Sequence, residues 1–559
     1  MQSFRYVVSR ADGITHRGRV ERTTTRIFRN CWEALVPPEL GAWEPKLDVS
    51  VVIPARGDQR ELDLALAALA AQTYPAHLLE VVVVDDHSRT PLRLPARRPA
   101  NCRMERAPLT GVGAGHARAY GAHVTSGEIL CWLDPDVVTD PWHVEAHARW
   151  QHLHPECVTL GRVGFPARCP HTAEEVVRLI ADGDLADSLG EARGHPWVQR
   201  VLDRTDDLRD ADHLGFHAHV GVSAAVRRSL YEAAGGVDPT LTLGQDTEFG
   251  YRLWQAGGVF LPEPRARGWH VGAGSSARTR VPSPRFRHAV LADLMPHPRC
   301  FRDDDGGGDA RRVPLVRAVV RVAGVRYELV RACVDRLLAG TERDLAVTLV
   351  ADWNSAAGAG AADPADPRPD PRLELRLVQA NYLGDPRVSF APHPPRTGFP
   401  SPYLLELPVG TGVGPDTVAR LVAAAERARA GLTELAGPDD APVPGLRLWR
   451  TRAVARALRV RDSHETLADT VTEVHGRLRV AMDENELTDL AALPVEELRA
   501  ALWSAAESTE AAAAGDTPAG PQPAAPTRRR LRGLARAMGR VLRPTRGRRR
   551  GDGTEEAAA

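Results

Sequence analysis

Several features that often decide the class of a protein are missing from this 559-residue sequence. No uncharged apolar run approaches the ~20 residues that a membrane-spanning helix needs, and residues 1–30 show no apolar core of a signal peptide. The seven cysteines form no CxxC pair, which argues against a disulfide framework and favours a reducing compartment. We therefore expect a cytoplasmic protein, and peripheral attachment to the inner face of the cell membrane stays open.

Lysine is almost absent, since Lys46 is the only one, although Lys+Arg and Asp+Glu each number 72. This balance identifies no partner, but residues 528–550 hold eleven arginines and no acid. Three interpretations of this segment remain open: a basic amphipathic helix on an anionic membrane surface, a solvated disordered tail, and a nucleic-acid contact. No aromatic residue is interleaved for base stacking, so we expect no specific nucleic-acid partner.

Apolar runs alternate with helical patterns from residue 47 onward. Buried strands are predicted at 49–54, 79–84 and 129–133, and helices at 61–71 and 114–124. Continuous Val/Ile strands separated by helices indicate a mostly parallel sheet with helices on both faces. The predicted fold class is therefore α/β.

The length of the chain predicts more than one domain. We expect a leader (1–46), a first α/β domain (47–300), a second α/β domain (310–510) and a disordered linker with an Arg-rich tail (511–559). Residues 317–329 echo residues 50–62, and each segment is followed by a helix, a threonine and a strand that ends in an acid. The second domain is interpreted as a degenerate repeat of the first, with an unrelated α/β domain as the alternative.

Acidic residues follow the predicted strands at three places. Asp85 and Asp86 follow the second strand, Asp134 and Asp136 follow the strand at 129–133, and Asp246 begins a later helix. Ligands bind at such strand ends in open α/β sheets, and carboxylates there suit Mg²⁺ or Mn²⁺ bridging to substrate phosphates. Helix caps and ordinary turns are the plainer interpretations of each motif alone. A dinucleotide site is disfavoured, because no GxGxxG motif follows the first strand.

Taken together, the motifs of residues 47–275 resemble the family 2 glycosyltransferases, which have a GT-A fold. The resemblance implies a Rossmann-like sheet and an inverting transfer of sugar from a nucleotide-diphosphate sugar. It rests on an ordered series of segments, each weak alone: Val51–Pro54, Gln72–Pro75, Val83–Ser88, Gly115–Gly121, Ser126–Asp136, Val226–Ser229, Gly235–Asp238, Gly244–Glu248 and Arg252–Leu253.

The resemblance also implies a role for each matched residue. Asp246 matches the general base, and Asp134 and Asp136 match the DxD motif that holds ribose and a Mn²⁺ or Mg²⁺ ion. His270 matches a late histidine that completes the metal site in some members. The nucleotide would be bound by Pro54, Asp86, Arg118 and Asp134, and the possible supporting residues are Ala55, Gln245, Glu248 and Arg252.

The sequence also departs from the family pattern. Gln245 stands where a glutamate usually precedes the catalytic aspartate, and it keeps the hydrogen bonding but not the charge. In the second half, Leu407–Gly410 replaces the DxD motif. The second domain would then be a scaffold, an acceptor-binding module or a dimer surface.

The sequence thus predicts a metal-assisted glycosyltransferase that acts on a nucleotide-sugar, in cell-envelope or other glycan synthesis. The acceptor would be a glycan, a lipid-linked molecule or another hydroxyl compound. General-base removal of the acceptor proton and charge stabilisation of the leaving diphosphate need no other catalytic group. An inactive glycan- or nucleotide-binding scaffold and a nucleotide-dependent oxidoreductase are the alternatives. The pair Cys169 and His171, close in sequence, is better explained as loop residues than as a zinc site.

Overall fold

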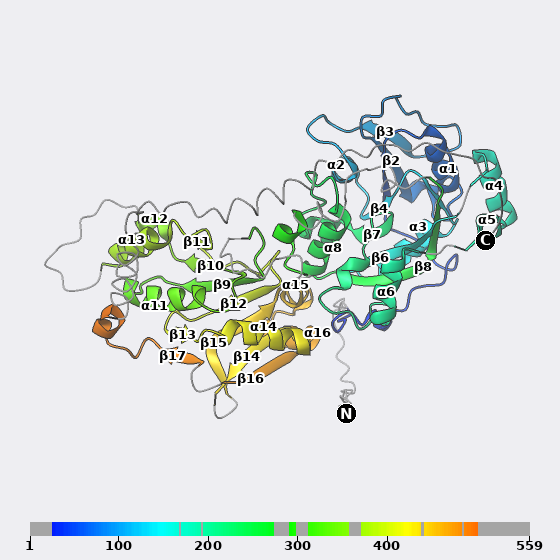
Figure 1. Ribbon diagram of the computed structural model, residues 1–559. Helices are drawn as coiled ribbons and strands as arrows, with labels where there is room; N and C mark the ends of the chain where they lie inside the picture. Colours follow the sequence, from blue (N-terminus) through cyan, green and yellow to red (C-terminus); the bar gives the residue numbers. More distant parts are fainter. Residues whose placement is uncertain are drawn as a thin grey trace, which may run out of the picture. The chain divides into compact units, whose positions relative to one another are not determined.

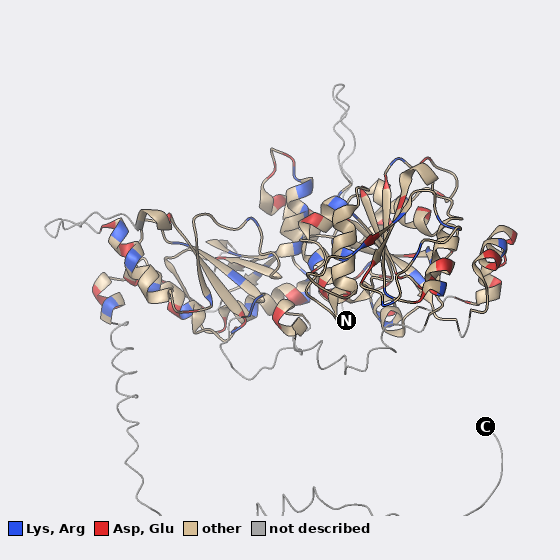
Figure 2. Ribbon diagram, turned by 90° about the horizontal axis from the view of Figure 1, so that it is seen from above, with Lys and Arg blue, Asp and Glu red and all other residues tan. Residues whose placement is uncertain are grey.

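The computed structural model describes residues 25–166, 169–191, 194–272, 290–297, 311–356, 370–437, 441–482 and 486–500 (Figure 1). The predicted Arg-rich tail and the first part of the predicted leader lie outside these residues. Basic and acidic residues are interspersed along the described helices and loops (Figure 2), in keeping with the balanced composition.

An eight-stranded sheet organises the first half of the chain, in the order β3-β2-β1-β4-β7-β6-β8-β5. The pairs β1–β2, β2–β3, β1–β4 and β6–β8 are parallel, whereas β4–β7, β6–β7 and β5–β8 are antiparallel. Its strands are β1 (Val49–Ala55), β2 (Leu79–Asp85), β3 (Cys102–Arg106), β4 (Ile129–Leu133), β5 (Val137–Thr139), β6 (Cys157–Gly164), β7 (Ser223–Arg227) and β8 (Val259–His270).

Alternation along the central strands explains why helices cover both faces of this sheet. Val52 and Trp132 pack into one hydrophobic cluster together with Ala117 of α2. Val51 and Cys131 point the other way, into a cluster with residues of α1 and α3. The helices of this half include α1 (Gln59–Leu69), α2 (Ala114–Val124), α3 (His143–Leu153), α7 (Arg228–Ala233) and α8 (Gln245–Gln255), with short 3₁₀ turns η1 (Trp32–Ala34), η2 (Ala76–Leu78) and η3 (Gly215–Ala218).

The polar, histidine-rich sequence of residues 170–215 predicts a variable insertion over a cleft, and the described part of this insertion is largely helical. It contains α4 (Ala173–Asp182), α5 (Leu185–Leu189) and α6 (Pro196–Arg204). Val176, Leu185 and Leu189 of α4 and α5 pack with Leu64 of α1 and with Trp269 of β8. A capping box at Thr172 and Glu175 begins α4.

A seven-stranded sheet organises the second half, in the order β11-β10-β9-β12-β15-β14-β16. Strand for strand, this repeats the first seven positions of the first sheet, including every parallel and antiparallel pairing. Its strands are β9 (Val316–Arg321), β10 (Leu345–Val350), β11 (Val388–Ala391), β12 (Tyr403–Glu406), β14 (Leu432–Ala436), β15 (Pro442–Arg450) and β16 (Arg477–Ala481), beside a separate pair β13 (Thr411–Val413) and β17 (Leu487–Asp489).

Local hydrogen bonds repeat as well. The backbone N–H of Thr73 donates to the carbonyl of Pro141 at 3.0 Å, and that of Thr341 donates to Pro415 at 2.8 Å. The expectation of a mixed α/β chain with a second α/β region is therefore confirmed, while the domain boundaries 47–300 and 310–510 stay predictions. The helices of this half are α11 (Tyr327–Leu338), α12 (Trp353–Ala356), α13 (Pro371–Tyr382), α14 (Thr417–Ala428), α15 (Thr451–Val460) and α16 (Leu467–His475).

Candidate functional site

Arg118 on α2 joins two of the acids that the sequence singled out. Its Nη1 donates to Oδ1 of Asp246 at 2.5 Å, and its Nη2 donates to Oδ1 of Asp134 at 2.7 Å and to the carbonyl of Gly221 at 2.9 Å. Burial lowers the pKa of Arg118, but the two carboxylates together raise it above its ordinary value. The guanidinium therefore stays charged and holds Asp134 and Asp246 on either side of one centre.

A carboxylate and an imidazole lie close together beside this centre. Asp136 Oδ1 is 3.2 Å from Nε2 of His270, the last residue of β8. Asp134, Asp136 and His270 each offer an oxygen or nitrogen ligand, and these atoms all lie within 4.8 Å of one another. Burial raises the pKa of Asp136 to about 6, while the nearby imidazole opposes that rise. Carboxylate oxygens with one imidazole form a donor set that fits Mn²⁺ or Mg²⁺.

Two glycines lie close to the carboxylates of Asp136 and Asp246. A Cβ added at Gly272 would lie 2.3 Å from Oδ2 of Asp136, and one added at Gly221 would lie 2.4 Å from Oδ1 of Asp246. Both positions thus require glycine if the carboxylates keep their places.

Asp86 lies at the end of β2, in a loop anchored to β1. Its Oδ2 accepts a hydrogen bond from the N–H of Gly113 at 2.9 Å, and its backbone N–H donates to the carbonyl of Ala55 at 2.8 Å. Its Oδ1 is buried and has no hydrogen-bond partner among the residues that the structure describes.

The first turn of α8 presents its acids to different neighbours. Asp246 contacts Arg118, and its backbone carbonyl lies 2.9 Å from Nδ1 of His219. Glu248 is almost fully buried and forms two hydrogen bonds with Arg252, at 2.5 and 2.7 Å. The structure therefore brings Asp246 into the site, while Glu248 and Arg252 bind each other. The side-chain Oε1 of Gln245 is buried without a partner among the described residues.

Sequence reasoning missed two neighbours of His270, namely Phe165 directly after β6 and His195 in the insertion. The ring of Phe165 lies 5.3 Å from that of His270 and 4.8 Å from that of His195, between centroids. Burial lowers the pKa of His195 to about 4, and the charge of Asp246 opposes the shift. The only sequence signal was the histidine-rich composition of the insertion, which has no fixed spacing to the strands.

A cavity of about 400 Å³ begins at His195 and runs between α6 and strands β6 and β8. One face of α6 lines it with His195, Val198, Gln199 and Leu202, opposite Arg162 and other residues of β6. The helix α6 of the insertion thus covers a hollow whose lining includes His195.

Comparisons with known proteins agree with the sequence resemblance. Residues 50–232 match the family model described as glycosyl transferase family 2, so this stretch is a glycosyltransferase domain of that family. Chondroitin synthase from Escherichia coli is 24% identical over 359 residues, covering 61% of this chain and 50% of that protein. Validoxylamine A glucosyltransferase from Streptomyces hygroscopicus subsp. limoneus is 29% identical over 276 residues, covering 47% of this chain and 58% of that protein. The aligned parts thus span about half the length of these relatives.

Among solved structures, the mannosyltransferase PcManGT from Pyrobaculum calidifontis, in complex with GDP-Man and Mn²⁺, is similar at a TM-score of 0.31 and 18% identity. The match covers 46% of this chain and 67% of that one. No helix in the described part of this chain is long and apolar enough to span a bilayer.

Proposed function

We propose that this chain, a glycosyltransferase through its family 2 domain, moves a sugar from a nucleotide-diphosphate sugar to a hydroxyl acceptor with inversion at the anomeric carbon. The observation that supports the proposal most is Arg118 bridging Asp134 and Asp246, with Asp136 and His270 beside it. In the proposal, Asp134 faces the donor and Asp246 faces the acceptor around this single centre.

In this proposal the donor nucleotide lies at the ends of β1 and β2. The free Oδ1 of Asp86 accepts a hydrogen bond from the base, and Pro54 and Ala55 form the wall of the pocket. Asp134 contacts the ribose, and Arg118 lies close enough to bias the diphosphate by its charge.

Asp136, Asp134 and His270 would hold Mn²⁺ or Mg²⁺, which supplies charge neutralisation for the departing diphosphate. Asp246 takes the proton of the acceptor hydroxyl as that oxygen attacks the anomeric carbon, and the bond from that carbon to the diphosphate oxygen breaks. Arg118 orients Asp246, since its Nη1 donates to Oδ1 of that carboxylate and leaves Oδ2 to accept the proton.

The acceptor would approach Asp246 from the side of His195, where the cavity under α6 begins. Polar groups along that cavity, such as Gln199 and Arg162, suit the hydroxyls of a glycan or of a lipid-linked sugar. A role in cell-envelope glycan synthesis, with the basic tail on an anionic membrane, is the corresponding cellular proposal.

The test is hydrolysis of nucleotide-sugars by the purified full chain, with a panel of UDP- and GDP-sugars in the presence and absence of Mn²⁺. We expect Mn²⁺-dependent release of nucleotide from one donor. Binding of a donor without any release, with or without candidate acceptors, would favour the inactive scaffold instead.

A further inference from the structure

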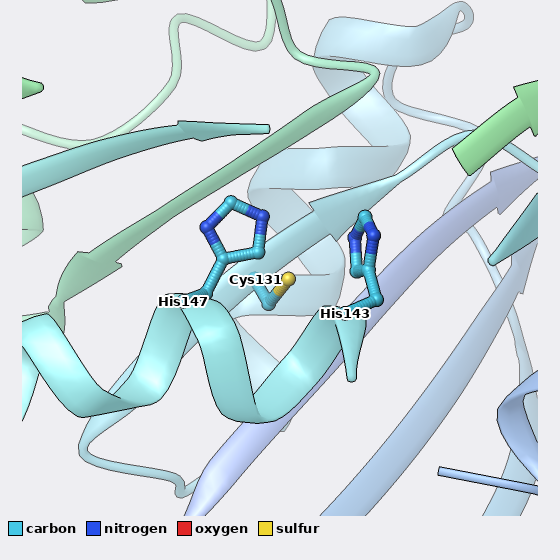
Figure 3. A group of neighbouring side chains, drawn as sticks. All are labelled: Cys131, His143 and His147. Carbon is cyan, nitrogen blue, oxygen red and sulfur yellow. The ribbon is translucent and has the colours of Figure 1, made fainter. Parts of the chain in front are cut away.

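A cluster of sulfur and nitrogen ligands lies in the core, outside the candidate site. Cys131 is in the middle of β4, and His143 and His147 lie one turn apart on α3. Figure 3 shows the thiol of Cys131 between the two imidazole rings, which rise from the same side of α3. Each residue is at most 1% exposed, and one ligand atom from each lies within 4.8 Å of the others.

The outer nitrogen of each ring is held by the surrounding structure. Nδ1 of His143 lies 2.8 Å from the carbonyl of Arg267, and Nδ1 of His147 lies 2.8 Å from Oγ1 of Thr159. The inner nitrogens of both rings converge on one atom, Oγ of Ser223, at 3.3 and 3.0 Å. Metal-binding histidines are typically oriented in this way, with the non-ligating nitrogen donating to a carbonyl or hydroxyl.

The hydrogen-bond partners of the two rings indicate which ring nitrogens carry a proton and which present a lone pair to Ser223. The carbonyl of Arg267 only accepts, so Nδ1 of His143 carries its proton and Nε2 presents a lone pair. The hydroxyl of Thr159 is 3.3 Å from the carbonyl of Ala225, and if it donates there, Nδ1 of His147 must be protonated as well. Two lone pairs then face Ser223, which has a single proton to donate.

A cation can satisfy both lone pairs, whereas a purely hydrogen-bonded core requires Thr159 to donate to His147 instead. Both imidazoles are neutral, since burial lowers the pKa of His143 to about 4 and that of His147 well below its ordinary value. Neutral imidazole and thiolate are the ligands that Zn²⁺ prefers, unlike the oxygen-rich set at Asp134 and Asp136.

We propose that Cys131, His143 and His147 bind one Zn²⁺ ion, or a cation of similar softness, with Oγ of Ser223 as a neutral fourth donor. The thiol of Cys131 loses its proton to solvent when the metal binds, and the two Nε2 atoms bind through their lone pairs. The ion would tie α3 to β4 only three residues before Asp134. It would act as a brace for the strand that presents the acids, and would not take part in sugar transfer.

Metal analysis of the full chain, produced without a polyhistidine tag and passed through metal-free gel filtration, tests the proposal. We expect about one zinc ion per wild-type chain, and a thiolate-to-metal charge-transfer band in protein grown with Co²⁺ in place of zinc. Cys131→Ser should lose the band and the zinc. The matched control is Cys157→Ser, which makes the same change at another fully buried strand cysteine and should keep both.

Two further measurements separate this site from the catalytic proposal. Asp136→Ala should keep its zinc and its cobalt band, because the oxygen-rich site is separate. A folded wild-type chain that takes up neither zinc nor cobalt would overturn the proposal, as would equal zinc in wild type and Cys131→Ser. The wild-type measurement decides the matter even if the cysteine variant fails to fold.

Discussion

In the first sheet the strand β4 leads into Asp134 and Asp136, whereas its counterpart β12 leads into Pro408 and Gly410. The equivalence follows from register, because Ile129 pairs with Val49 and Tyr403 pairs with Val316 at the start of the corresponding central strands. Five residues on from Ile129 and Tyr403 are Asp134 and Pro408, and seven residues on are Asp136 and Gly410.

The bridging arginine has no counterpart either. In the first half, α2 fills the connection between β3 and β4 and carries Arg118. In the second half, the described residues 392–402 make that connection without a helix. The second sheet thus repeats the strand pairing of the first but lacks counterparts of Asp134, Asp136 and Arg118. This difference indicates that burial constrains the apolar residues within the strands, whereas the residues at the strand ends can change.

The largest effect is expected from replacing Asp136, the proposed metal ligand, whose counterpart in the second half is Gly410. Asp136→Ala should abolish metal-dependent donor binding while the fold survives, because the residue follows a strand and does not fill the hydrophobic core. Isothermal titration with UDP or GDP and Mn²⁺ measures this. Glu406→Gln, at the end of β12, is the matched control and should bind as wild type. Unchanged affinity in Asp136→Ala would remove Asp136 from the metal site.

A large effect is also expected from replacing Asp246, the proposed general base. Asp246→Asn keeps shape and hydrogen bonding but cannot take a proton, so transfer should fall roughly 10²-fold or more. Donor affinity should stay near the wild-type value, which separates chemistry from binding. Asp469→Asn, in the first turn of α16 in the second half, should leave transfer unchanged. Near-normal turnover of Asp246→Asn on the true acceptor would place the base elsewhere.

A moderate effect is expected from replacing Arg118, which has no counterpart in the second half. Arg118→Met leaves two carboxylates facing each other, and the free energy of unfolding should fall by about 1–3 kcal/mol. Water offsets part of this loss, since the side chains of Asp134 and Asp246 are 26% and 29% exposed. Urea denaturation measures it, with Arg372→Met on the exposed surface of α13 as the control. Equal stability of the two variants would show that the bridge contributes nothing.

The smallest effect on activity is expected from deleting the Arg-rich tail, which lies outside the residues that the structure describes. Deleting residues 528–559 removes the arginine cluster but none of the matched motifs, so donor hydrolysis should be unchanged. Binding to vesicles rich in anionic lipid should weaken, and full-length binding should fall with added salt. Equal co-sedimentation of both proteins at low salt would leave the solvated disordered tail as the explanation.

Much of the fold was predictable because it depends on local sequence patterns. The apolar runs at 49–54, 79–84 and 129–133 became β1, β2 and β4 within one or two residues. The apolar pattern of residues 219–224 predicts a strand from His219, but β7 begins at Ser223, after the turn η3, because Phe216 and Ala218 pack into the core as a 3₁₀ turn. Such a turn has no distinctive periodicity in a short segment.

The sequence by itself determined which acids follow which strands, since strand ends and motif order can be read along one dimension. Only the tertiary structure decided that Arg118 bonds both to Asp134 and to Asp246, which lies 128 residues further along the chain than Arg118. The same holds for metal ligands: Cys169 and His171 are close in sequence, yet His171 bonds to Ser188, while Cys131 meets His143 and His147 from a different element. Side chains from separate elements come together only when the sheet and helices pack, because burial of apolar faces sets those distances and sequence spacing does not.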